Sequence, residues 1–234
     1  MSGAALKLYD LAGADDNCRF SPFCWRAKLA LAHKRLAVET IPWRFTEKDR
    51  IAASGQGRVP VLVDGDKWIA DSWNIACYLE DAYPDRPSLF GGGAGRALTC
   101  FYVGWADTVL QPAMVRLIVR DIVDHLHPKD RDYFRKSREE RLGKTLEEVV
   151  ADRDKSLPAF RASLAPLRTV LKDQPFLGGA SPLQADYVVF GGFQWARAIS
   201  AFALLDKNDV VHAWRERLLD LYDGLARKAP AVAA

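Results

Sequence analysis

The sequence predicts a small α/β domain with a mixed four-stranded sheet, followed by an all-α domain. Strand and helix patterns alternate over the first third of the 234 residues. A stretch rich in proline and glycine, "PDRPSLFGGGAG", then ends that alternation. Beyond about residue 96, apolar residues recur at helical spacing. We therefore assign residues 1–88 to the first domain, 89–95 to a linker and 96–234 to the second domain.

In the first domain, the predicted order is β-α-β, then a β-hairpin and a helix. "ALKLYDL" alternates apolar and polar side chains as a half-buried strand does. A helix is predicted from Ser21 to about Lys34, and "AVETIPWRF" predicts a second strand, in which Pro42 favours an edge position. "VPVLVDGDKWIAD" predicts a hairpin, because two β-rich runs flank residues 64–66. "SWNIACYLEDAY" predicts a helix that ends before Pro84.

The second domain combines amphipathic helical runs with one apolar run. The amphipathic runs are "RALTCFYVGWADTVLQPAMVRLIVRDIV", "RDYFRKSREERLGKTLEEVV" and "LPAFRASLAPLRTVLKD". "LQADYVVFGGFQWARAIS" is apolar on nearly all sides, so we expect a central buried helix with Trp195 in the core. Leu183 cannot cap this helix. We expect a capping box of Ser181, Pro182 and Gln184 that shifts the helix start.

Composition argues against several classes of function. The net charge is only +3, without the concentrated basic face of a nucleic-acid-binding protein. "MSGAALKLYDLAG" lacks a signal-peptide pattern, and no apolar run approaches the ~18 residues that span a bilayer. The four cysteines lack metal-ligand spacing, as do His125 and His127, so we expect no metal site. We expect a cytoplasmic protein whose cysteines are free thiols, with no membrane or nucleic-acid partner.

The stretch "SPFCWR" contains the first candidate site. Pro22 suits the first turn of a helix, which makes Ser21 the N-cap. A helix N-terminus stabilises an anion, and a hydroxyl there can donate a hydrogen bond to a thiolate. Since the hydroxyl itself does not usefully ionise, Ser21 would serve a sulfur supplied by a small molecule. The alternative is a structural cap, worth about 1 kcal/mol.

Two further stretches have both a binding and a structural interpretation. In "GRVPVL", a cis Val59-Pro60 bond would turn the N–H and C=O of Val59 towards an extended peptide ligand. In "IADSWNIACYL", Ser72 is the expected N-cap of the next helix and could hold a carboxylate, while Asp71 could hold an ammonium group. The alternatives are an ordinary edge-strand proline and an ordinary helix cap.

Together and in this order, these stretches resemble the thioredoxin-like half of the glutathione transferases. "SPFCWRAKLAL", "RVPVLVDGDKWIADSWNIACYLE" and the helical second half extend the resemblance over essentially the whole chain. The resemblance implies glutathione as the cofactor, with Ser21 as the catalytic residue that contacts its sulfur. The residues that it assigns to the rest of glutathione are Phe23, Lys48, Val59, Pro60, Asp71 and Ser72.

Within that family, the chain is most similar to the bacterial β-etherases, which use glutathione to cleave lignin-derived β-aryl ethers. The similarity lies in "SPFCWR", "RVPVLVDGDKWIADSW", "HPKDRDYFRKSRE" and "LEEVVADRDKSLP", and fungal Ser-type transferases share similar motifs. Such etherases continue into a C-terminal tail, whereas this sequence ends soon after "LYDGLARKAP". Ether specificity is therefore left open.

The resemblance implies a homodimeric enzyme in which the glutathione thiolate attacks a small hydrophobic, aromatic electrophile. We expect the electrophile between the domains, against Phe101, Tyr102 and Trp105, for which packing in the helical core is the alternative. Two other functions stay open. One is a non-catalytic, transferase-like binding module, and the other is a thiol oxidoreductase that works through Cys18 or Cys24.

Overall fold

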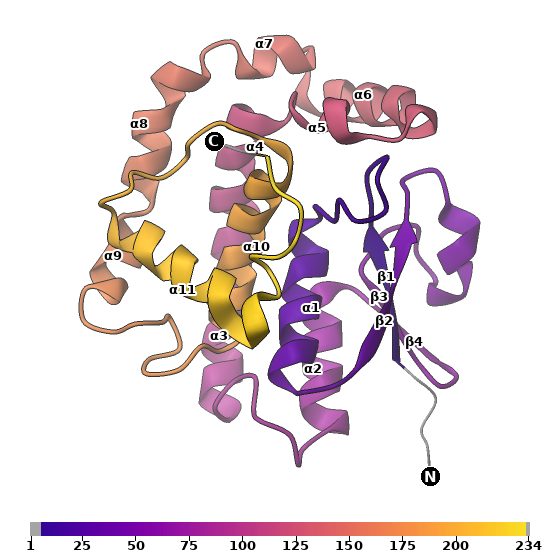
Figure 1. The fold of residues 1–234 in the computed structure, drawn as a ribbon, viewed down its shortest axis with the longest axis vertical. Coiled ribbons are helices and arrows are strands. Elements are labelled where there is room, and N and C mark those ends of the chain that lie inside the picture. The colour runs from indigo at the N-terminus through magenta and orange to yellow at the C-terminus, as the bar shows by residue number, and fades with distance from the viewer. Residues whose placement is uncertain (1–5, 233–234) are drawn as a thin grey trace.

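A computed structural model describes residues 6–232 of the chain. A four-stranded mixed sheet with helices, a thioredoxin-like arrangement, comes first, and helices alone follow, which confirms the predicted fold class (Figure 1). The elements of this first, α/β part are β1 (Leu6–Leu11), α1 (Pro22–His33), β2 (Val38–Trp43), the 3₁₀ helix η1 (Lys48–Ser54), β3 (Val61–Asp64), β4 (Lys67–Ala70) and α2 (Ser72–Ala82).

The sheet has the strand order β2-β1-β3-β4. Strand β1 pairs in parallel with β2 and antiparallel with β3, and β3 and β4 form the predicted antiparallel hairpin. Pro42 lies in the edge strand β2, as predicted, where its missing N–H costs no ladder hydrogen bond. Gly65, in the turn between β3 and β4, has a φ of +58°, which favours glycine.

The helical part begins within the predicted linker and wraps one side of the α/β part (Figure 1). The first amphipathic run, predicted from residue 96, forms a nearly continuous helix that includes a π-helical stretch. The second predicted run, residues 131–150, is divided into two helices at Gly143, which has a φ of +68°. The elements are α3 (Gly93–Trp105), the π helix η2 (Ala106–Leu110), α4 (Gln111–Ile118), α5 (Ile122–His125), α6 (Pro128–Leu142), α7 (Leu146–Val150), α8 (Arg153–Ser163), α9 (Ala165–Leu171), α10 (Gln184–Ile199) and α11 (Val210–Gly224).

Helix α10 is the central buried helix, as predicted, and it packs directly on α1. Gly191 permits this close approach, because a Cβ atom there would lie 2.3 Å from the carbonyl oxygen of Pro22. The buried Arg26 of α1 joins the two parts. Its Nε donates to the carbonyl oxygen of Val188 at 3.2 Å, and its Nη2 pairs with Asp107 at 2.6 Å. The start of α1 is therefore held by the helical part.

The expected capping box before α10 is wrong. The helix starts at Gln184 without a shift, and Leu183 is the N-cap residue through its backbone alone. Instead, the buried carboxylate of Asp186, in the first turn, satisfies the backbone N–H groups that precede the helix. It accepts hydrogen bonds of 2.7 to 3.0 Å from the backbone N–H groups of Leu177, Gly178 and Leu183 and from the indole of Trp214.

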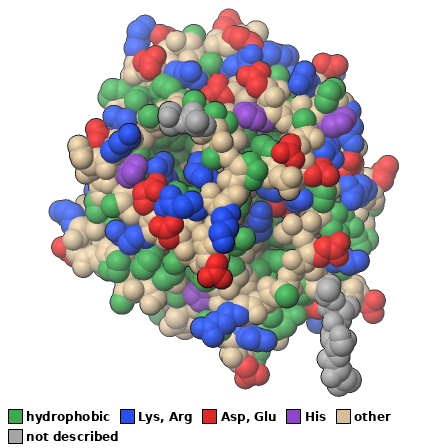
Figure 2. Space-filling view, in the orientation of Figure 1, with side chains coloured by type: hydrophobic (Ala, Val, Ile, Leu, Met, Phe, Trp, Pro, Cys, Tyr) green, Lys and Arg blue, Asp and Glu red, His purple; other side chains and the backbone are tan. Residues whose placement is uncertain are grey.

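The surface in Figure 2 shows acidic and basic side chains interspersed with apolar ones, consistent with the small net charge. Among the helices of residues 6–232, none is long and apolar enough to cross a membrane.

Candidate functional site

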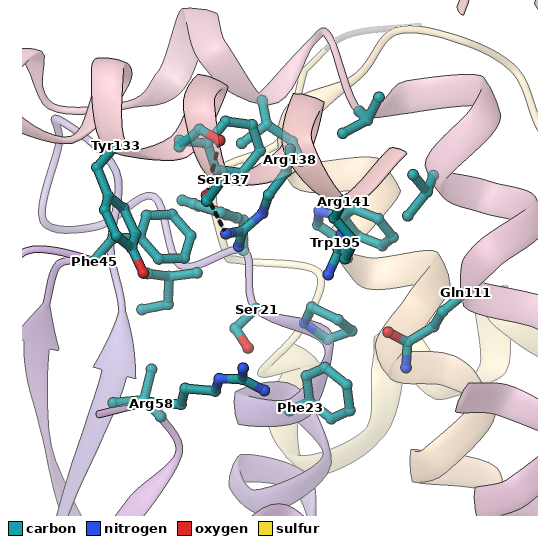
Figure 3. A pocket seen from close by; sticks show the side chains of 18 of the residues that line it. Ser21, Phe23, Phe45, Arg58, Gln111, Tyr133, Ser137, Arg138, Arg141 and Trp195 are labelled. Carbon is teal, nitrogen blue, oxygen red and sulfur yellow. Dashed lines mark hydrogen bonds between the residues drawn. The ribbon is translucent and has the colours of Figure 1, made fainter. Parts of the chain in front are cut away.

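A cavity of about 390 Å³ lies between the α/β part and the helical part (Figure 3). Two walls, one from each part, enclose it. Among the residues of the α/β wall are Ser21, Phe23, Phe45, Arg58 and Val59. Among those of the helical wall are Gln111, Tyr133, Phe134, Arg138, Arg141 and Trp195.

Ser21 lies at the centre of this cavity and is the N-cap of α1, as predicted (Figure 3). Its backbone is extended, and Pro22 follows as the first helical residue. The Ser21 Oγ accepts a hydrogen bond of 3.2 Å from the N–H of Cys24. Because that bond uses a lone pair of the oxygen, the hydroxyl proton stays available for an acceptor in the cavity.

The Val59-Pro60 peptide bond is cis, which is one of the two interpretations that the sequence left open. Strand β3 begins only at Val61, so Val59 stands just outside the strand pairing. Within residues 6–232, neither the N–H nor the C=O of Val59 makes a hydrogen bond. The backbone of Val59 therefore offers a donor and an acceptor at the α/β wall, while Pro60 is buried behind it.

The N-cap of α2 is Asp71, and the expectation that Ser72 caps this helix is wrong. The Asp71 Oδ1 accepts from the N–H groups of Trp73 at 2.9 Å and Asn74 at 3.1 Å. Aspartate is an equally good cap, and here it has an unusual φ of +77°. Ser72 is the first helical residue and is buried, whereas Asp71 is exposed. Neither residue lines the cavity.

Lys48 also lies outside the cavity lining, at the start of η1. Its side chain is exposed, and its Nζ lies 5.1 Å from the ring centroid of Tyr133, which does line the cavity. The aliphatic stem of Lys48 packs close to Gly57, another lining residue. The ammonium group is therefore near the rim of the cavity.

The aromatic residues expected to meet the electrophile do not lie in this cavity. Phe101, Tyr102 and Trp105 are on α3, outside the cavity lining, and Phe101 is 70% exposed. Trp195 was expected wholly in the core, but although it is only 7% exposed it lines the cavity. A helical period identifies a face of a helix but not what that face contacts.

Helix α6 supplies the functional residues that the sequence analysis missed. Phe134, Arg138 and Arg141 recur at a helical spacing that was visible in "YFRKSREER", but such a pattern is equally typical of a solvated face. What brings α6 across the cavity is the buried Asp130 in its first turn. The Asp130 carboxylate accepts from the N–H groups of Phe45 and Thr46, each at 3.1 Å, and from the Thr46 hydroxyl at 2.7 Å.

The cavity is positively charged, because the residues of the described part of the chain that line it include three arginines and no acidic side chain. Figure 3 shows Arg58 and Arg138 extending towards the space around Ser21 from opposite walls. The half-buried Arg138 guanidinium lies 4.7 Å from the ring centroid of Phe134. Burial, with repulsion from Arg141 and Arg58, lowers the Arg138 pKa to about 10, so the group remains charged at neutral pH.

The thiols beside the cavity are not activated. Cys18 and Cys24 are both free and buried, as expected of a reduced protein. Burial raises the pKa of both thiols, and nearby Asp10 adds to the increase for Cys24. A reactive redox cysteine needs the opposite shift. Among residues 6–232, no three His, Cys, Asp or Glu side chains are grouped closely enough to hold a metal ion.

Two family models match the chain. The model of the glutathione S-transferase N-terminal domain matches residues 17–87, and that of the C-terminal domain matches residues 97–223. Among curated proteins, glutathione S-transferase Z1 of Arabidopsis thaliana is 31% identical over 111 residues, which is 45% of this chain and 50% of that protein. The chain thus spans about half the length of the curated relatives that it matches first.

Similar solved structures cover nearly the whole chain. Glutathione transferase GSTFuA3 from Phanerochaete chrysosporium has a TM-score of 0.77 and 25% identity, over 95% of this chain and 93% of that one. A glutathione S-transferase of Ceriporiopsis subvermispora, CsGST63524, solved in complex with glutathione, has a TM-score of 0.82 and 21% identity. That match covers 98% of this chain and 100% of the other, and at this identity it shows the shared fold.

Proposed function

We propose a function from one premise: this chain belongs to the glutathione S-transferase family. Glutathione is the cofactor, and the enzyme joins it, through its sulfur, to an electrophilic carbon. The observation that carries this proposal is the position of Ser21, which combines the N-terminus of α1 with the wall of a cavity. The complex of CsGST63524 with glutathione supports the choice of cofactor.

The chemistry of the α/β wall follows from the start of α1. The glutathione sulfur accepts a hydrogen bond from the Ser21 hydroxyl, and the partial positive charge of the helix N-terminus favours its ionised form. The thiolate then attacks the electrophilic carbon. A carbon–sulfur bond forms as the bond to the leaving group breaks, and the leaving group departs with the electron pair.

The rest of glutathione binds along the α/β part. The N–H and C=O of Val59 pair with the peptide backbone of the tripeptide, and Pro60 supports this loop from behind. The carboxylate of Asp71 holds the α-ammonium group, and the first turn of α2 at Ser72 receives the adjacent carboxylate. The ammonium group of Lys48 binds the glycine carboxylate at the cavity rim.

The electrophile occupies the remainder of the cavity and is aromatic. The rings of Phe45, Phe134 and Trp195 line this space and support an aromatic substrate. Together with the sequence resemblance to the bacterial β-etherases, they support a β-aryl ether as one candidate substrate. In that reaction the carbon–oxygen bond breaks and a phenolate leaves.

A homodimer is part of the same proposal. Leu98, Phe101 and Val109 recur at helical spacing along α3 and η2, with exposed fractions of 69%, 70% and 41%. Such a row of exposed apolar side chains is typical of a protein–protein contact. We propose that a second copy of the chain covers it.

Calorimetric titration with glutathione, followed by turnover assays, tests the proposed function. The panel contains both enantiomers of a β-aryl ether and a generic halo-aromatic. We expect uptake of glutathione and turnover of at least one electrophile, and light scattering of the same sample should give twice the 26.1 kDa of one chain. Absence of glutathione uptake contradicts the proposal. Uptake without any turnover favours the non-catalytic binding module instead.

A further inference from the structure

We propose that the electrophile is an aromatic acid, and that Arg138 and Arg141 of α6 bind its carboxylate. This inference rests on the proposed function, and it names the class of substrate that the helical wall selects. The observation behind it is a set of guanidinium groups that face the cavity without acidic partners.

Of the other two arginines of α6, Arg131 donates to the carbonyl oxygen of Leu126 at 3.3 Å, and Arg135 is neutralised by carboxylates of the protein. Arg135 of α6 pairs with Glu139 and Glu147, each at 2.8 Å. In contrast, no carboxylate of residues 6–232 lies within ion-pair distance of Arg138 or Arg141. Among the described residues, the side chain of Arg138 donates only to the Ser137 hydroxyl, at 2.9 Å, which leaves most of its donors for a ligand.

The unpaired charge of Arg138 is costly because the side chain is half-buried. Burial and the neighbouring cations Arg141 and Arg58 disfavour its charged form, as the lowered pKa of about 10 indicates. An anion bound between these groups would relieve that repulsion and form charge-assisted hydrogen bonds. Since a guanidinium has a planar fork of donors, it matches a carboxylate better than a lysine would.

The surroundings of Arg138 favour an aromatic acid over a small inorganic anion. Its guanidinium lies 5.0 Å from the ring centroid of Phe45 and 4.7 Å from that of Phe134. These rings, together with Trp195, provide apolar surface next to the charge. A ligand that carries a ring and a carboxylate can use both features at once.

The arginines of α6 lie on the wall of the cavity opposite to the one proposed to bind the carboxylates of glutathione. The proposed contacts of the tripeptide lie on the α/β part, at Val59, Asp71 and Lys48. Arg58 precedes Val59 directly, so we assign Arg58 to the glutathione side of the cavity. Arg138 and Arg141 face the same space from the opposite wall, where the electrophile must stand.

Binding of two glutathione conjugates tests the inference without requiring turnover. One conjugate carries a nitrobenzoate ring on the sulfur, and the other carries the matching nitrobenzamide, which has nearly the same shape without the charge. We expect the wild-type protein to bind the acid conjugate about tenfold more tightly than the amide, the size of one charge-assisted hydrogen bond. Calorimetry measures both dissociation constants, together with that of glutathione alone.

Single substitutions then assign the preference to α6. Arg141→Gln, at an exposed position, and Arg138→Gln should each reduce the acid-over-amide ratio by about threefold, and the double variant should bring it close to one. Lys136→Gln is the matched control, because it removes one positive charge from an exposed position of α6 outside the cavity, and it should leave the ratio unchanged. Circular dichroism of each variant confirms that α6 is folded.

The possible outcomes separate this inference from the proposed function. Equal binding of the acid and amide conjugates by the wild-type protein overturns the inference, while the function stands. Weakened binding of glutathione itself in both arginine variants also overturns it, because the arginines would then serve the cofactor. If neither glutathione nor either conjugate binds, the proposed function fails first.

Discussion

The two walls of the cavity are built in different ways. The α/β wall offers groups that are fixed by local backbone structure, namely the N-cap hydroxyl of Ser21 and the peptide groups of Val59. The helical wall offers long side chains, Arg138 and Arg141, on a helix that is positioned by a distant contact through Asp130. The first wall suits a constant cofactor, and the second suits a substrate that can differ between relatives. If this comparison is right, substitutions in the two walls should affect different measurements.

The largest expected effect belongs to the α/β wall. Ser21→Ala removes the proposed hydrogen-bond donor to the sulfur, so kcat/KM should fall about a hundredfold for every electrophile, as for the loss of one preorganised donor. The pKa of the bound glutathione thiol should rise, which can be followed through the ultraviolet absorbance of the thiolate. The free energy of unfolding should fall by only about 1 kcal/mol, the value of a lost cap.

A remote cap provides the control for Ser21. Thr145 forms a capping box at α7, where its Oγ1 accepts from the N–H of Glu148 at 3.2 Å, and it lies outside the cavity. Thr145→Ala should cost a similar free energy of unfolding and leave kcat/KM unchanged. Undiminished turnover in Ser21→Ala, with the same loss of stability, would mean that Ser21 is a cap and nothing more.

An intermediate effect is expected where the helical wall is anchored. The two carboxylate oxygens of Asp130 accept three hydrogen bonds from Phe45 and Thr46. Asp130→Asn removes the charge and replaces one of these oxygens by an amide nitrogen, which cannot accept a hydrogen bond. We expect the free energy of unfolding to fall by about 2 kcal/mol in a denaturant titration. The KM of an aromatic acid should rise more than the KM of glutathione, because α6 is loosened.

The matched control for that substitution is Asp132→Asn, which removes the same charge from an exposed position on α6. It should change the free energy of unfolding by less than about 0.5 kcal/mol. Equal effects of the two substitutions would show that net charge, and not the contact of Asp130 with the α/β part, determines the position of α6.

The difference between the walls also explains how much the sequence could predict. The N-cap at Ser21 and the order of strands and helices in the α/β part follow from residues that are close together in the chain, and the structure confirms them. At Val59-Pro60, the structure selects the cis bond from the two interpretations that the sequence left open. The predicted N-cap of α2 was wrong by one residue, because aspartate and serine are both good N-caps. The structure decides between them: Asp71, with a φ of +77°, lies outside the helix, and Ser72 is its first residue.

The helical wall could not be predicted in the same way. Phe101 and Phe134 have the same chemistry, and each lies on an amphipathic helix. The contacts of Asp130 and Lys129 with the loop after β2, across more than eighty residues of sequence, hold α6 over the cavity, whereas the side chain of Phe101 is exposed outside it. A helical period contains no information on such a contact. The substrate side of the cavity therefore required the three-dimensional structure.

The smallest expected effect lies at the other end of α1, where both parts meet away from the cavity. The His33 Nδ1 is 2.7 Å from the hydroxyl oxygen of Tyr187, which in turn hydrogen-bonds to the hydroxyl of Tyr222. Burial lowers the pKa of His33 below its usual value near 6.5. The protonated form is thus disfavoured in the folded protein, and the neutral ring is part of the folded structure.

The direction of the pH dependence follows from that lowered pKa. Above about pH 6.5 the ring is neutral in both the folded and the unfolded chain, so the stabilisation is fully present. As the pH falls from there towards the folded-state pKa, the unfolded chain takes up a proton first, and the free energy of unfolding decreases. His33→Gln should flatten this part of the pH profile in denaturant titrations, whereas Tyr222→Phe should keep the slope because the titrating ring remains.

A slope that survives in His33→Gln would assign the pH dependence to another group. The kcat/KM at neutral pH should change little in either variant, because neither residue lines the cavity.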